Sequence, residues 1–294
     1  LGARYRLLRP LAAGGMAELF LALQYARSGF EKLVVIKRLR EKFLGDPRVI
    51  ALFLDEARIG SWLNHPNIVQ VFDVEEDEGV PFIAMEFIRG EELSRIARRG
   101  LELDQFLPPR MAVELIRQAA SALAHVHEFR QPLPGGALGA ALDIVHCAIS
   151  PNNLMVTASG FLKVIDFGIA RHRFSESGEA TVLPGKLSYM SPEQARREPV
   201  DHRSDQFSLA VVLYELTVGR RLFRGQPDDV FARITEGKIT PPREVDPEFP
   251  AELQDILMRA LALAPSDRFA SSAAFAEALG DFLAASGSPV TNTM

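Results

Sequence analysis

Two charged side chains in the first quarter of the chain are predicted to face apolar surroundings, where a charge needs a partner. Lys37 lies in the β-prone run 32–39, and the two-residue repeat of a strand places it on the same face as Val35. Glu56 lies on the apolar stripe of a helix expected over 47–63. Because an isolated charge is unfavourable there, we expect a Lys37–Glu56 ion pair. Two solvated surface side chains are the alternative.

A glycine-containing turn and two side chains with oxygen atoms are candidates for binding phosphate and a metal ion. In the turn 11–19, Gly14 and Gly15 would let backbone amides approach phosphate oxygens, although most such turns are plain hairpins. Asp166 follows an apolar run, and Asn153 precedes it in the same region. Their oxygens suit a hard cation such as Mg²⁺, whereas either residue alone is more often part of a turn.

The elements that must position these residues change in type along the chain. The first third predicts short strands and one helix, the region after residue 91 predicts mainly helices, and 131–199 is predicted to be irregular. The expected strands are 5–11, 18–23, 32–39, 69–75 and 81–87, and the expected helices are 47–63, 111–129, 204–218, 227–236, 250–264 and 272–284. Strands first and helices later indicate an α+β fold with a small sheet lobe and a larger helical lobe.

Composition excludes several classes of protein. The 294 residues carry 33 Lys and Arg against 38 Asp and Glu, a net charge of −5, so a nucleic-acid-binding surface is not expected. With 47% hydrophobic and 24% charged residues, the chain is typical of a globular protein. The single cysteine, Cys147, cannot form an internal disulfide, which favours a reducing, cytoplasmic location. No apolar run is long enough to predict a membrane segment.

In this order and spacing, the motifs resemble those of a bacterial eukaryotic-type Ser/Thr protein kinase domain, from about residue 5 to 283. The matching motifs are the Gly-rich loop 12–17, Val34-Val35-Ile36-Lys37, Glu56, Leu63-Asn64-His65-Pro66-Asn67-Ile68-Val69, the hinge-like Met85-Glu86-Phe87-Ile88, Asp166-Phe167-Gly168, Ser191-Pro192-Glu193, Asp205 and Arg268. The resemblance implies one two-lobed kinase-like domain over 1–294. Its parts would be a small antiparallel sheet lobe with one helix over about 1–85, a hinge at 86–90, a helical lobe over about 91–284 and a tail at 285–294.

The resemblance also implies a site for ATP and Mg²⁺. Lys37, held by Glu56, would contact the α- and β-phosphates, and Asn153 and Asp166 would coordinate the metal. The other residues at nucleotide-binding positions of the family are Leu11, Ala12, Gly14, Leu19, Val35, Met85, Met155 and the backbones of Glu86 and Ile88.

Departures from the family pattern bear on catalysis. Where the family has His-Arg-Asp, this chain reads His146-Cys147-Ala148. The family's Asp orients the substrate hydroxyl and accepts its proton, and losing a general base costs about 10²–10⁴ in rate. Cys147 replaces an Arg that pairs with a phosphorylated activation loop in many kinases. Ala12 and Ala17 replace glycines, and alanine is expected to be strained wherever φ must be positive.

The sequence therefore predicts a regulatory module, a pseudokinase that binds ATP and signals to a protein partner such as another kinase or a signalling protein. The alternatives are an active or weakly active Ser/Thr kinase and a scaffold that binds no nucleotide. An engineered substitution at position 148 is a competing explanation for Ala148, but it would not account for Cys147, Ala12 and Ala17.

Two further structural expectations follow. Glu193 and Arg268 match family positions that form a structural ion pair, so we expect them to pair here. The stretch 131–141 contains Pro132, Pro134 and several glycines, and we expect an exposed loop that serves as a partner site.

Overall fold

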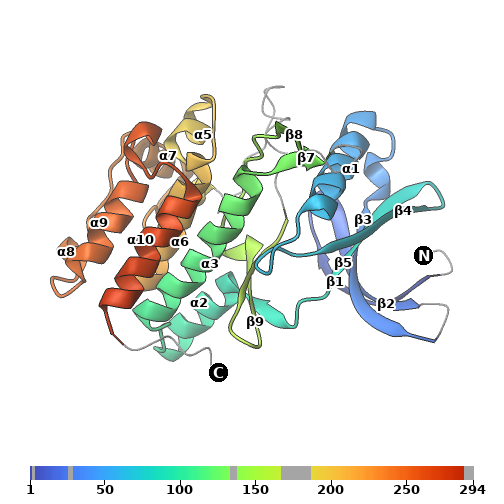
Figure 1. The fold of residues 1–294 in the computed structure, drawn as a ribbon, viewed down its shortest axis with the longest axis horizontal. Helices are drawn as coiled ribbons and strands as arrows, with labels where there is room; N and C mark the ends of the chain where they lie inside the picture. The colour runs from blue at the N-terminus through green and yellow to red at the C-terminus, as the bar shows by residue number, and fades with distance from the viewer. Residues whose placement is uncertain (2–3, 26–28, 133–137, 167–186, 288–294) are drawn as a thin grey trace. The chain divides into compact units, whose positions relative to one another are not determined.

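A computed structural model describes residues 1, 4–25, 29–132, 138–166 and 187–287. The chain divides into two compact units, Leu1–Arg89 and Gly90–Met294, each with its own buried core. The first unit is mainly sheet and the second mainly helix (Figure 1). The predicted α+β architecture, with an antiparallel sheet followed by a helical region, is confirmed.

The first unit is built on a five-stranded antiparallel sheet in the order β1-β2-β3-β5-β4. The strands are β1 (Tyr5–Ala13), β2 (Ala17–Tyr25), β3 (Glu31–Leu39), β4 (Val71–Asp77) and β5 (Val80–Glu86). A single turn of 3₁₀ helix, η1 (Glu41–Phe43), precedes helix α1 (Pro47–Trp62). The side chain of Asp46 caps α1 by accepting a hydrogen bond from the amide of Arg48, and Pro47 fits the first helical position.

Alternation along the strands gives the sheet a face with a buried apolar core. Val34 and Ile36 of β3 belong to this core, where the rings of Tyr5 and Phe82 meet edge to face at 5.7 Å. Lys37 has the opposite parity and points away from it. Helix α1 lies close against β4, because a Cβ added at Gly60 would come within 2.8 Å of Val71.

The second unit is mainly helical in the part of the chain that the structure describes. Its helices there are α2 (Leu93–Leu103), α3 (Pro109–His127), α5 (Pro192–Arg196), α6 (Arg203–Val218), α7 (Pro227–Thr235), α8 (Pro242–Val245), α9 (Ala251–Ala260) and α10 (Ser272–Ala285). Figure 1 shows α3 beside both α6 and α10, and these helices pack on one another. Twelve of the 16 residues of α6 are buried, including the polar Asp205, Gln206 and Ser208. Buried polar groups need hydrogen-bond partners, and several candidate functional residues of this unit are such partners.

Short elements connect these helices. The 3₁₀ turns are η2 (Pro151–Asn153), η3 (Leu187–Tyr189) and η4 (Pro265–Asp267), and the strands are β6 (Gly90–Glu92), β7 (Arg130–Pro132), β8 (Leu138–Ala141), β9 (Leu154–Thr157) and β10 (Leu162–Val164). Strands β10, β9 and β6 form a small sheet in that order. Within the described ranges, no helix has both the length and the apolar character needed to cross a bilayer.

Two expectations are corrected here. The segment 131–199 is not uniformly irregular, since it contains β8, β9, β10, η2, η3 and α5. The stretch 131–141 was expected to be a loop, but β7 and β8 pair as an antiparallel hairpin, with Arg130 opposite Ala141 and Pro132 opposite Leu138. Pairing satisfies backbone groups that a loop would leave to water. Ala140 and Ala141 are nevertheless exposed, and residues 133–137 lie outside the described part.

Candidate functional site

The Lys37–Glu56 ion pair predicted from the sequence is confirmed in the first unit. Nζ of Lys37 donates to Oε1 of Glu56 at 2.8 Å, which joins β3 to α1. The two side chains are 15% and 13% exposed, so the pair is largely but not completely buried. A cation at this depth, fixed by a carboxylate, can contact an anionic ligand.

The turn between β1 and β2 is narrow and carries both glycines. The amide of Gly14 donates to the carbonyl of Ala17 at 2.9 Å, and a Cβ at Gly15 would meet no atom within 4 Å. Ala12 pairs with Leu19 in the β1–β2 ladder, and Ala17 begins β2. Neither alanine has a positive φ, so the strain expected from these replacements is absent. Extended backbone accommodates a Cβ, which explains the difference.

The residues predicted to enclose a nucleotide base are divided between the units. In the first unit, Val35 and Met85 are direct cross-strand partners, and the side chain of Leu11 is 37% exposed. Ile88 follows β5 and is buried. Met155 is half-buried on β9 of the second unit. The structure therefore brings together the members on β3 and β5, and places Met155 in the other unit.

In the second unit, Asp205 of α6 holds the loop that contains Ala148. Its Oδ2 accepts from the amide of His146 at 2.8 Å, and its Oδ1 accepts from the amide of Cys147 at 2.9 Å. The Nε2 of His127 lies 2.9 Å from Oδ2. Burial acts to raise the pKa of Asp205, but hydrogen bonding to His127 and the His146 amide, together with nearby histidine charge, lowers it overall. Asp205 is thus an ionised anchor inside the unit.

The loop that contains Ala148 has a residue with positive φ and further hydrogen bonds to its backbone. Cys147 adopts a left-handed conformation with φ of 58°, and burial raises the pKa of its thiol, which keeps it protonated. Nδ2 of Asn153 donates to the carbonyl of Ala148 at 2.8 Å, and Nε2 of Gln194 donates to the carbonyl of Cys147 at 3.0 Å. The backbone around position 148 is therefore fixed from both sides. Ala148 carries only a methyl group there and offers no proton acceptor.

Asn153 and Asp166 meet the requirements of a divalent-cation site only in part. The amide of Ile165 donates to the carbonyl of Asn153 at 3.0 Å, which brings the segment ending at Asp166 alongside η2. Asn153 is 6% exposed, whereas Asp166 is exposed and has a positive φ of 59°. No group of three or more His, Cys, Asp or Glu residues in the described ranges could hold a metal. One carboxylate and one amide oxygen fit Mg²⁺ that is shared with phosphates and water.

Phe167 and Gly168, predicted to complete the metal-binding triplet, lie outside the described residues.

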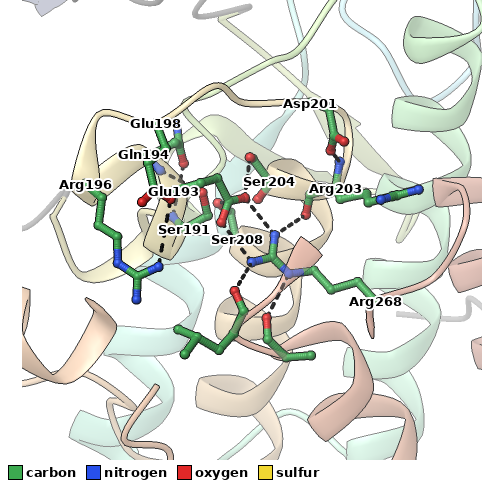
Figure 2. A network of polar contacts seen from close by, with 12 residues as sticks. Ser191, Glu193, Gln194, Arg196, Glu198, Asp201, Arg203, Ser204, Ser208 and Arg268 are labelled. Atoms are coloured by element: carbon green, nitrogen blue, oxygen red, sulfur yellow. Dashed lines mark hydrogen bonds and ion pairs between the residues drawn. The ribbon is translucent and has the colours of Figure 1, made fainter. Parts of the chain in front are cut away.

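The predicted Glu193–Arg268 pair is confirmed and forms the centre of a larger network (Figure 2). Nη1 and Nη2 of Arg268 donate to the two carboxylate oxygens of Glu193 at 2.7 and 2.8 Å. The remaining N–H groups of Arg268 donate to the carbonyls of Arg203, Ala262 and Leu263. The arginine therefore uses all of its donors while almost completely buried.

Helix α5 carries Glu193 into this network. Ser191 caps the helix in a reciprocal capping box with Gln194, and Oγ of Ser204 donates to Glu193 at 2.5 Å. Burial acts to raise the pKa of Glu193, but the Arg268 guanidinium and the Ser204 hydroxyl lower it overall. Because Gln194 also donates to Cys147, the same short helix ties this ion pair to the loop that contains Ala148.

Three supporting residues were not found from the sequence. His127 binds Asp205, Gln194 binds the carbonyl of Cys147, and Ser204 binds Glu193. Polar residues inside a predicted apolar helix could have identified some of these supports. Ser204 and Asp205 are such residues, because both are buried in α6. The sequence gives no comparable signal for Gln194, whose partner is a backbone carbonyl.

Comparison with known proteins gives a consistent match. The model of the protein kinase domain family matches residues 5–279. The tyrosine-protein kinase MasK of Myxococcus xanthus is 41% identical over 281 residues, which cover 95% of this chain and 43% of the relative. The serine/threonine-protein kinase pkn3 of the same species is 35% identical over 285 residues, covering 92% of this chain and 48% of the relative. The chain thus spans less than half the length of these relatives.

A solved structure agrees with the sequence matches. The kinase domain of PknI from Mycobacterium tuberculosis aligns with a TM-score of 0.68 and 26% sequence identity, over 95% of this chain and 96% of that domain. Together with the family match, the confirmed ion pairs and the α+β architecture, this assigns the fold. The chain belongs to the protein kinase domain family.

Proposed function

We propose that this domain is a pseudokinase, which binds ATP with Mg²⁺ and regulates a protein partner without transferring phosphate at an ordinary kinase rate. The observation that carries the proposal is the contrast within one loop. Asp205, Asn153 and Gln194 hold the backbone around Ala148, yet residue 148 has no group to accept a proton. Phosphoryl transfer in kinases uses a carboxylate at the corresponding position to orient the substrate hydroxyl.

In this proposal the nucleotide is bound by this chain's own residues in the roles predicted from the sequence. Lys37, positioned by Glu56, contacts the phosphates. Asn153 and Asp166 hold Mg²⁺, which would neutralise phosphate charge when bound. We further propose residues 86–90 as the hinge between lobes 1–85 and 91–284, with 285–294 as a tail. Because ATP is a cytoplasmic metabolite, we expect the domain to work there, with another kinase or a signalling protein as its partner.

A second candidate function is a slow protein kinase, and the relatives favour it. MasK and pkn3 are both named as kinases, one for tyrosine and one for serine or threonine. Positioning and electrostatics contribute to phosphoryl transfer without a base, so some transfer would survive at Ala148. The unstrained backbone at Ala12 and Ala17 removes one argument against activity.

Two measurements decide between these functions. A thermal-shift series with ATP, ADP and Mg²⁺ tests binding, with the Lys37→Met variant as control; absence of any shift in the unmodified chain would favour a scaffold that binds no nucleotide. Transfer of radiolabelled phosphate to a basic protein and to the domain itself tests activity, with Asp166→Ala as background. A rate of roughly 1–100 per second would exclude the pseudokinase. Nucleotide binding with transfer at the Asp166→Ala background supports it.

A further inference from the structure

A large groove in the second unit contains none of the residues assigned above to nucleotide, metal or catalysis. It has a volume of about 1020 Å³ and lies between α2 and the end of α6, with the segment that joins α2 to α3 along one side. All of its lining residues belong to Gly90–Met294, so the groove is complete within one unit.

The groove is positively charged on a chain that is negative overall. Its lining has five arginines against three glutamates, whereas the whole chain has a net charge of −5. The arginines are Arg95, Arg98 and Arg99 on α2 and Arg220 and Arg221 after α6. A local charge opposite in sign to the net charge marks a place that attracts anionic groups.

The three glutamates in the lining offset the charge of the five arginines only in part. Three ion pairs join two of them to the arginines of α2, namely Arg95–Glu91 at 3.6 Å, Arg98–Glu102 at 3.8 Å and Arg99–Glu102 at 2.9 Å, all between exposed side chains. Such exposed pairs are weak, so these arginines are available to a ligand. Glu215 is different, because its Oε2 accepts the Tyr189 hydroxyl at 2.8 Å and its Oε1 is shielded from solvent.

Arg220 and Arg221 line the groove just after the end of α6. Arg221 lies over the ring of Tyr189, with its central carbon 5.9 Å from the ring centroid. Arg220 is exposed and makes no hydrogen bond or ion pair with the described residues. A carboxylate entering the groove would therefore find an uncommitted donor at Arg220.

Large apolar side chains also lie exposed along the groove. Leu101 is 59% exposed, Leu103 is 48% exposed and Phe106 is 51% exposed, and all three line the groove. The Phe106 ring faces Gly219, where an added Cβ would be 3.7 Å away, so this ring reaches across to the end of α6. Neighbouring exposed apolar side chains beside charged ones are typical of a binding surface for another protein.

We propose that this groove docks an acidic segment of a partner protein, with Asp or Glu side chains on the arginines and large apolar side chains on Leu101, Leu103 and Phe106. Charge complementarity decides the occupant, because a basic segment would meet five arginines. The docking does not depend on nucleotide and does not require phosphate transfer.

The test uses a short fluorescein-labelled peptide in which Glu alternates with Leu and Phe, titrated with the domain by fluorescence polarisation. We expect saturable binding that weakens with added salt, because exposed charges are screened. The Arg220→Glu variant should bind about tenfold more weakly, equivalent to about 1.4 kcal/mol. Arg224→Glu is the matched control, since Arg224 is exposed nearby but does not line the groove. Phe106→Ser should also weaken binding.

Two results would overturn the proposal: equal binding by a peptide with Lys in place of Glu, or equal losses for Arg220→Glu and Arg224→Glu. Circular dichroism and thermal melting of each variant show whether it is folded. Repeating the titration with saturating ATP and Mg²⁺ separates the two proposals. Peptide binding without any nucleotide-induced thermal shift would leave the docking groove in place and contradict the proposed nucleotide binding.

Discussion

Each unit has a glutamate–cation pair of low exposure, Lys37–Glu56 in the first and Glu193–Arg268 in the second, and the two pairs differ in how they are held. In the first unit, Lys37 and Glu56 share one hydrogen bond of 2.8 Å and remain 15% and 13% exposed. In the second unit, Glu193 and Arg268 form a bidentate pair and are 4% and 0% exposed. Ser204 and three backbone carbonyls satisfy the remaining polar groups of the buried pair.

The difference in burial and bonding suits the Lys37–Glu56 pair to binding a ligand and the Glu193–Arg268 pair to stabilising the fold. The amine of Lys37 makes a point-like contact and is partly exposed, so an anionic ligand can share it. The guanidinium of Arg268 has no donor left for a ligand. A buried cation with every donor used contributes to stability, and its loss is costly because the partner carboxylate stays behind.

The largest effect is expected at the second pair. Glu193→Ala should lower the free energy of unfolding by about 3–5 kcal/mol, because Arg268 would be left charged and buried. Denaturant titration measures this loss. Glu198→Ala on the same segment is the control, since Glu198 is 51% exposed and its pair with Arg196 is long. Nucleotide affinity of any folded Glu193→Ala protein should stay unchanged, and equal stability of the two variants would contradict the comparison.

Substitution in the Lys37–Glu56 pair should affect nucleotide affinity more than the free energy of unfolding. Lys37→Met should cost only about 1–3 kcal/mol in stability, because Glu56 keeps access to water, but it should weaken ATP binding at least about tenfold. Calorimetric titration with ATP and Mg²⁺ gives the affinity, and Lys42→Met serves as an exposed control. A variant that loses as much stability as Glu193→Ala but keeps its nucleotide affinity would show that Lys37 is structural.

The stability contributions of two glutamates in the second unit, the buried Glu193 and the half-buried Glu215, should respond to pH in opposite directions. The pKa of Glu193 is lowered by Arg268 despite burial, so its contribution is complete above the ordinary carboxyl pKa and is lost as the pH falls through the folded value. Burial raises the pKa of Glu215, so its ionisation destabilises the fold as the pH rises through the folded value. Glu215→Gln should therefore raise stability at neutral pH and change it little in acid. Denaturation midpoints across a pH series test this, and a loss at neutral pH would contradict it.

The smallest effect is expected at an exposed ion pair. Arg99 and Glu102 on α2 lie 2.9 Å apart, but they are 66% and 50% exposed. Arg99→Ala should change the free energy of unfolding by no more than about 0.5 kcal/mol. The same denaturant titration measures it, and a change near that of Glu193→Ala would mean that distance, and not burial, determines the strength of these pairs.

Prediction from the sequence was most accurate where a charged residue lay in an apolar pattern and therefore required a partner in a neighbouring element. Lys37 and Glu56 were paired because strand and helix periodicity turned both towards apolar faces, and α1 and β3 lie close to their expected ranges. The Glu193–Arg268 pair came from resemblance to the family, since no local pattern connects residues so far apart in the chain.

The failures have physical causes as well. Helix α2 was missed although its apolar residues recur at helical spacing, because three arginines and one glutamate make the segment polar on average and only Leu93 is buried. The hairpin of β7 and β8 was read as a loop because its strands are short and rich in Gly, Ala and Pro. Ala12 and Ala17 were expected to be strained, but backbone conformation at a turn depends on register, and both lie in extended strands.

The supports of the loop around Ala148 have a consequence for how such a site changes over generations. Asp205, Gln194 and Asn153 hold that backbone through its amides and carbonyls, and none of these bonds involves the side chain at position 148. Selection for a stable domain therefore preserves the shape of the loop even where residue 148 is free to drift. The backbone conformation of this loop is therefore retained together with the fold. A change from Ala to Asp at position 148 would require only one altered base in a suitable codon.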